Sequence, residues 1–159
     1  MKIVVISDTH IPRVAHDIPP QIYSDIETCD AIINAGDFVE EALLDKLNIL
    51  RKTYAVCGNM DTDNLRRRLK QKEVIKFGKF KVGIIHGYGA PRDIEETVMK
   101  EFTEVDAIVF GHSHSATNVL KSGILLFNPG SPTDKIFAKS NSYGILEISD
   151  KIEGRIINL

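Results

Sequence analysis

Blocks of apolar residues alternate with amphipathic blocks along the first half of the chain. Three short runs, at 3–6, 31–35 and 53–57, are rich in β-branched and other apolar residues and predict strands. Their nearly continuous apolar character is typical of strands that are covered on both faces of a sheet. Between them, apolar residues recur at helical spacing over 22–29 and 39–50. The order strand, helix, strand, helix, strand predicts a parallel α/β sheet.

The second half of the chain predicts a different arrangement, with a hairpin and several short strands. Segments 73–77 and 80–85 flank the turn residues Gly78 and Lys79. A helical stripe over 94–102 precedes an apolar strand at 106–110. Four further strands are expected, at 117–120, 124–127, 144–148 and 154–157. Because no linker or repeat divides the chain, we expect a single domain over 1–159. Its expected fold is α/β: a four-layer αββα sandwich of two mixed sheets packed face to face, with helices outside.

Composition excludes several classes of protein. Of the 159 residues, 43% are hydrophobic and 26% are charged, which is typical of a folded globular protein. The formal net charge of -2 gives no general attraction to nucleic acid or acidic membranes. Cys29 and Cys57 are too few for a disulfide framework, although one bridge between them stays open. With no signal peptide or membrane-spanning run in this sequence, we expect a cytoplasmic protein without a membrane partner.

Polar side chains of the types that bind metals follow the predicted strands where each strand ends. The set comprises Asp8, His10, Asp37, Asn59, His86, His112 and His114. It includes four of the five histidines, and we assign no role to His16. In α/β folds, sites form beyond the carboxyl ends of the strands. Each residue has a structural explanation when taken singly, such as a helix cap or a turn. Seven such residues at successive strand ends favour one shared site.

The chemistry of this set favours a divalent metal. Carboxylate, amide and imidazole groups without a thiolate suit Mn²⁺, Fe²⁺, Zn²⁺ or Ni²⁺. Seven ligands are too many for one tetrahedral zinc ion. They are enough for two ions that share a bridging carboxylate. Two ions ~3.5–4 Å apart can clamp a phosphoryl group and activate a bridging hydroxide.

The motifs together resemble those of the calcineurin-like metallophosphoesterases. That family carries Asp-x-His, Gly-Asp, Gly-Asn-x-Asp/Glu, a later His and Gly-His-x-His. The corresponding residues here are Asp8-Thr9-His10, Gly36-Asp37, Gly58-Asn59-Met60-Asp61, His86-Gly87 and Gly111-His112-Ser113-His114. Their order and spacing match from residue 3 to about residue 132. The short length and the Asn128-Pro129-Gly130-Ser131 segment resemble the small phosphodiesterase branch of bacteria and archaea.

The resemblance implies a role for each candidate residue. Asp8, His10 and His114 would hold the first metal ion, and Asn59, His86 and His112 the second. Asp37 would bridge the ions together with a hydroxide, which attacks a phosphodiester in line with the leaving oxygen. We expect Mn²⁺ first, with Ni²⁺, Fe²⁺ or Zn²⁺ also suited to the ligands. In this scheme Asp37, Asn59 and His112 are the catalytic residues. Asn59 and Ser131 would contact a small phosphodiester substrate, with a purely structural turn as an equal alternative for Ser131.

One position departs from the family pattern. Met60 stands where many members carry a histidine that protonates the leaving group, and a thioether cannot donate a proton. Losing a general acid typically costs ~10²–10⁴-fold, so esters with poor leaving groups should react slowly.

Two alternatives to a phosphodiesterase remain open. A retromer subunit has this fold, serves as a protein-binding scaffold and has lost part of the ligand set. The DNA-repair branch of the family contains nucleases, but the near-neutral charge here does not favour a nucleic-acid partner. The complete set of seven ligands favours an enzyme. The oligomeric state is open, a homodimer included.

Three further features have simpler explanations. The basic run from Arg66 to Lys72 is typical of a solvated helix end that complements the helix dipole. Tyr88 either stacks on a substrate ring or is an ordinary surface residue. Asp61 is expected to cap the following helix or to support the site, not to bind metal.

Overall fold

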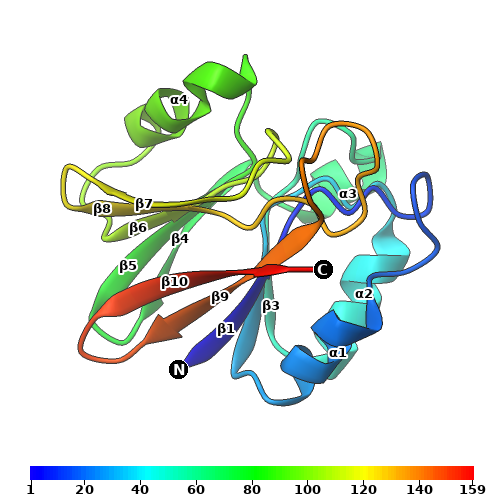
Figure 1. Cartoon of the computed structure of the whole chain (residues 1–159), viewed down its shortest axis with the longest axis horizontal. Coiled ribbons are helices and arrows are strands. Elements are labelled where there is room, and N and C mark those ends of the chain that lie inside the picture. Colours follow the sequence, from blue (N-terminus) through cyan, green and yellow to red (C-terminus); the bar gives the residue numbers. More distant parts are fainter.

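The computed structural model describes residues 1–159 and contains two five-stranded sheets (Figure 1). The first sheet has the order β10-β9-β1-β2-β3 and the second the order β4-β5-β6-β8-β7. The strands are β1 (Lys2–Ile6), β2 (Ala31–Asn34), β3 (Thr53–Ala55), β4 (Lys72–Phe77), β5 (Phe80–Ile85), β6 (Ala107–Val109), β7 (Thr117–Lys121), β8 (Ile124–Asn128), β9 (Ser142–Ile148) and β10 (Ile152–Asn158). The helices are α1 (Pro20–Glu27), α2 (Glu41–Leu50), α3 (Asp63–Arg68), the 3₁₀ turn η1 (Pro91–Asp93) and α4 (Ile94–Lys100).

Both sheets are mixed, as predicted. In the first sheet β1, β2 and β3 run parallel, whereas β9 pairs antiparallel with β1 and with β10. In the second sheet β5, β6 and β8 run parallel, whereas β4 and β7 pair antiparallel at the two edges. The parallel strands lie next to one another in each sheet, at the centre of the second sheet and on one side of the first. Their carboxyl ends can therefore supply loops to one site.

The strand β1 shows how the sequence builds the layers. Alternate residues of a strand face opposite sides of its sheet. Ile3 and Val5 accordingly belong to the apolar core between the two sheets, where Val82 and Val109 of the second sheet also lie. Val4 and Ile6 belong to a second core, shared with the helices on the outer face. Because both faces of β1 are covered, its buried residues, Ile3 to Ile6, are all apolar.

The helices form the two outer layers of the sandwich. α1 and α2 cover the first sheet, and their buried residues include Ile22, Ile26 and Leu47 (Figure 1). α4 covers the outer face of the second sheet through Ile94 and Val98. The predicted αββα architecture is therefore confirmed.

Three details refine the expectations from sequence. The cap of α3 is Thr62, whose hydroxyl accepts the backbone N–H of Leu65, and not Asp61. Cys29 and Cys57 are both free and buried. None of the helices has the length and apolar character that crossing a membrane requires.

Candidate metal centre

The seven candidate ligands are gathered by loops that follow β1, β2, β3, β5 and β6, so both sheets contribute to one site. Five of them adopt left-handed backbone conformations, with φ between 47° and 68°: Asp8, His10, Asp37, His112 and His114. Asp and His are among the few residues that enter this region with some frequency. These turns follow β1, β2 and β6 and place the side chains at the junction of the two sheets. The carboxylate-bearing residues Asp8 and Asp37 are 0% and 2% exposed.

His10, His114 and Asp8 form the first cluster. The Nε2 atoms of His10 and His114 lie 3.2 Å apart. Nε2 of His114 also lies 3.4 Å from Oδ1 of Asp8. One ligand atom from each of the three residues falls within 4.8 Å of the others, which is close enough to hold one ion.

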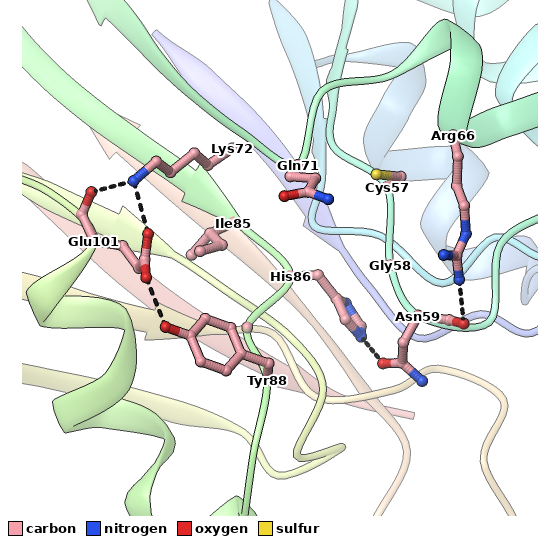
Figure 2. Close-up of a pocket in the computed structure, with 11 residues that line it drawn as sticks. Cys57, Gly58, Asn59, Arg66, Gln71, Lys72, Ile85, His86, Tyr88 and Glu101 are labelled. Atoms are coloured by element: carbon pink, nitrogen blue, oxygen red, sulfur yellow. Dashed lines mark hydrogen bonds and ion pairs between the residues drawn. The ribbon is translucent and has the colours of Figure 1, made fainter.

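Asn59, His86 and His112 form the second cluster. The side-chain oxygen of Asn59 lies 3.1 Å from Nε2 of His86 and 3.0 Å from Nδ1 of His112 (Figure 2). The other nitrogen of each ring faces a backbone carbonyl, that of Ala35 for His86 and that of Gly89 for His112. Because a carbonyl only accepts, these outer nitrogens carry the hydrogens. The inner nitrogens are thereby left to bind a cation.

Asp37 lies between the two clusters. Its Oδ2 atom is 3.3 Å from Nε2 of His86 and 3.7 Å from Nε2 of His10. Its Oδ1 atom accepts the backbone N–H of Met60 at 2.8 Å. Asp8 also borders both clusters, because its Oδ1 atom lies 3.9 Å from Nε2 of His86. The family resemblance had implied that Asp8 contacts the first ion only.

His112 and His114 take different places, although one residue separates them. An extended segment would have directed both rings to the same side. Residues 111–114 are not a strand, and both histidines have positive φ. His112 consequently faces Asn59, and His114 faces His10.

Charge within the site shifts the pKa values of its groups. Burial opposes protonation of His86, but Asp37 and Asp8 outweigh it and raise the pKa to about 9. Burial likewise opposes protonation of His114, but Asp8 and Asp134 raise its pKa to about 9. Burial prevails at His10 and lowers its pKa. Burial would raise the pKa of Asp37, but His86 holds it below the usual range. A metal ion that binds here displaces protons from imidazoles.

The Asn128-to-Ser131 segment clamps the ligand-bearing loops. The side-chain amide of Asn128 donates to the carbonyl of Gly111 at 2.9 Å and to the hydroxyl of Ser113 at 3.0 Å. The hydroxyl of Ser131 donates to the carbonyl of Asp8 at 2.7 Å and accepts the N–H of Asp134 at 3.0 Å. Ser131 is fully buried. These contacts favour the structural alternative for its side chain over contact with substrate.

Asp134 supports the site and was missed in the sequence. Its Oδ2 atom lies 2.5 Å from Nδ1 of His114. The same carboxylate accepts the backbone N–H groups of Ile136, Phe137 and Ala138. It lies beyond the Asn128-to-Ser131 segment that follows β8 and not directly at a strand end, so the strand-end pattern did not reveal it. A signal was nevertheless present, because Asp commonly bonds to backbone groups a few residues further on in a tight turn.

Asp61 ties together two of the loops that carry ligands. Its carboxylate accepts the backbone N–H of Val39 at 2.7 Å and that of Gly58, also at 2.7 Å. A Cβ atom at Gly58 would lie 2.0 Å from Oδ1 of Asp37, so only glycine fits there. The expected supporting role of Asp61 therefore fits the structure, whereas the expected capping role does not.

A cavity of about 410 Å³ opens beside the second cluster (Figure 2). Asn59 and His86 form one side of it, and Tyr88 forms another. Arg66 and Lys72, at the two ends of the basic run, also line it. Both residues are exposed, so the expected solvated face holds for them, and they border the cavity as well. Tyr88 is 56% exposed, and its hydroxyl donates to Glu101.

A two-sheet αββα sandwich with imidazoles, carboxylates and an amide at its strand ends defines the metallophosphoesterase class of protein. The family model of the calcineurin-like phosphoesterase superfamily domain matches residues 1–151. The chain therefore belongs to this superfamily, as the motifs had indicated.

Individual relatives agree with this assignment. The chain is 36% identical to a probable metallophosphoesterase from Methanocaldococcus jannaschii, over 99% of this chain and 81% of the relative. The structure of an archaeal phosphodiesterase superposes with a TM-score of 0.76 and 24% identity, covering 100% of both chains. Vps29 from Chaetomium thermophilum superposes with a TM-score of 0.80 and 19% identity, covering 100% of this chain and 97% of that one. At these identities the two structures show a common fold.

Proposed function

We propose that this protein is a phosphodiesterase that uses two divalent metal ions. One observation carries the proposal: two clusters of metal-ligand side chains lie side by side, and Asp37 has a carboxylate oxygen within 3.7 Å of a histidine from each. Asp8, His10 and His114 would hold one ion, and Asn59, His86 and His112 the other. Asp37 would contact both. The donor set, two carboxylates, one amide and four imidazoles, fits ions such as Mn²⁺.

Bound divalent ions supply Lewis-acid stabilisation of phosphoryl oxygens and lower the pKa of a coordinated water. The protein's own residues orient these groups. The carbonyls of Ala35 and Gly89 fix the tautomers of His86 and His112. The N–H of Met60 holds Asp37 in place, while the side chain of Met60 donates no proton to a leaving group. Diesters with good leaving groups are therefore the expected substrates.

Reconstitution tests this proposal. Protein stripped of metal by a chelator should not hydrolyse bis(4-nitrophenyl) phosphate, and Mn²⁺ should restore hydrolysis. Asp37→Asn should lower the metal content and reduce kcat by at least ~10²-fold, because its carboxylate would contact both ions. Asp150→Asn is the matched control, since Asp150 is exposed. A fully loaded wild-type protein that hydrolyses none of several diesters would refute the proposal.

The similarity to Vps29 raises the alternative of a protein-binding scaffold. The same assay of diester hydrolysis by the metal-loaded protein separates the two functions. A scaffold needs no hydrolysis, whereas the proposed enzyme needs both metal clusters to be occupied for turnover. The geometry of the complete ligand set favours the enzyme.

A further inference from the structure

The cavity beside Asn59 and His86 has a size and lining suited to part of a substrate. Its volume of about 410 Å³ falls within the range of ≈300–1,000 Å³ that is usual for small-molecule sites. It adjoins the second metal-ligand cluster, because Asn59 and His86 belong to both (Figure 2). A group attached to a phosphate at the metal centre can therefore extend into it.

Arg66 places a fixed cation in this cavity. Its Nη2 atom donates to the carbonyl of Asn59 at 2.7 Å, and its Nε atom donates to the carbonyl of Asp61 at 3.0 Å. Figure 2 shows the guanidinium directed toward Asn59. Both partners are neutral carbonyls, and Arg66 forms no ion pair with a carboxylate. A guanidinium has five N–H donors, so several remain for a ligand.

The other charges of the cavity lining cancel. The ammonium of Lys72 pairs with Glu101 at 2.7 Å, and Tyr88 donates to the second oxygen of the same carboxylate, also at 2.7 Å. Asp61 does not line the cavity, and its carboxylate is engaged by two backbone N–H groups. The lining outside the metal cluster therefore carries one uncompensated positive charge, that of Arg66.

We infer that the cavity is a subsite for a second anionic group on an organic substituent of the phosphodiester, and that Arg66 binds that group. The inference rests on the proposed function, since the charge of the diester itself would be met at the metal centre. A carboxylate or a phosphate on the substituent supplies acceptor oxygens in the geometry that a guanidinium binds with two parallel hydrogen bonds. The substrate class is a diester with at least one further negative charge.

Three symmetric diesters test this inference, because with identical substituents the orientation in the site does not matter. They are bis(4-carboxyphenyl), bis(4-phosphonophenyl) and bis(4-carbamoylphenyl) phosphate, of which the last carries no second charge. Arg66→Gln should lower kcat/KM for the two charged esters on the order of tenfold more than for the carbamoyl ester. The relative losses for carboxylate and phosphonate show which anion the subsite prefers. Arg66→Lys, which retains the charge, should recover most of the preference.

Arg67→Gln is the matched control, because Arg67 does not line the cavity and its side chain donates to that of exposed Asn64, at 2.7 Å. This variant should not change the ratio between esters. Metal content is measured for each variant, since Arg66 also holds the carbonyl of Asn59. Equal losses for charged and neutral esters in Arg66→Gln would overturn the inference. If the loaded wild type hydrolyses none of the esters, the proposed function fails instead. In that case the affinities of wild type and Arg66→Gln for bis(4-carboxyphenyl) phosphate are measured by calorimetry. Equal affinities would overturn the inference without any activity measurement.

Discussion

The imidazole of His114 is held from two sides. Its Nε2 atom faces His10 and Asp8, and its Nδ1 atom faces Asp134 at 2.5 Å. Carboxylates behind metal-binding histidines orient the ring and increase its basicity, and losing one typically costs 10–100-fold in metal affinity. Burial opposes ionisation of Asp134, but His114 and three backbone N–H groups hold its pKa at about 2. Asp134 is therefore a charged positioning residue throughout the neutral range.

Asp134→Asn should weaken the metal position that contains His114 by ~10–100-fold and leave the other position largely intact. Calorimetric titration with Mn²⁺ measures the two affinities separately. Nitrogen chemical shifts of the His114 ring, followed against pH in the metal-free variant, should also show a lower pKa than in wild type, because Asp134 raises that pKa. A merely structural effect would not produce this change. Asp150→Asn serves as the control. Two positions weakened equally, or an unchanged His114 ring, would contradict the positioning role.

The sequence predicted a set of candidate ligand residues, and the structure brings these residues together. How they divide between two clusters depends on the backbone. The spacing of His112 and His114 suggests one shared volume if the segment is extended. The observed positive φ values separate the rings. Arg66 shows a similar limit, because its contact with the carbonyl of Asn59 depends on how the loop after β3 folds back. Neither feature leaves a pattern in a single sequence.

At the scale of elements, a partly buried hydrogen bond joins helix α1 to strand β9. The hydroxyl of Tyr143, a fully buried residue on β9, donates to Oδ2 of Asp25 on α1 at 2.5 Å. Burial and the neighbouring carboxylate raise the pKa of Tyr143 to about 12. Lys2 on β1 also pairs with Asp25, at 2.8 Å. These polar contacts determine the position of α1 on the first sheet.

This bond predicts a pH dependence of stability. Above pH 10 an unfolded tyrosine loses its proton, while folded Tyr143 keeps it until about pH 12. The unfolded state then holds fewer protons than the folded state, so stability falls as pH rises from about 10 to 12. Tyr143→Phe should cost about 1.5 kcal/mol at pH 8 and lose this part of the pH dependence. Urea unfolding of wild type and Tyr143→Phe at pH 8 and at pH 12 measures the difference in their free energies of unfolding. A constant difference between pH 8 and 12 would contradict the prediction.

Most strands could be predicted from the sequence, but their order in the sheets could not. The apolar run of β1 predicts a strand that is covered on both faces, which is what the structure shows. Its pairing with β9, in which Ile3 lies opposite Leu146, joins segments from opposite ends of the chain. Such pairing depends on how whole faces pack, and local periodicity carries no information about it.

At the scale of the whole molecule, the candidate metal centre spans the junction of the two sheets. Asp8 and Asp37 follow strands of the first sheet, whereas His86 and His112 follow strands of the second. Between the sheets lies an apolar core. A few hydrogen bonds also join the sheets, such as that from the side-chain amide of Asn118 on β7 to the carbonyl of Gly154 on β10, at 2.6 Å. An ion that contacts ligands from both sheets would therefore add a further cross-link between the two layers.

Metal binding should consequently raise the stability of the whole chain. A ligand that binds only the folded state at 1,000 times its dissociation constant contributes ~4 kcal/mol. For a chain of this size, each kcal/mol moves Tm by roughly 2–4 °C, so one occupied position should raise Tm by roughly 8–16 °C. Calorimetry with Mn²⁺ and with a chelator measures the shift. Asp37→Asn should show a smaller shift than wild type, because it removes the carboxylate placed between the clusters. Equal Tm values for wild-type protein with saturating Mn²⁺ and with chelator would mean that the clusters do not hold metal across the two sheets.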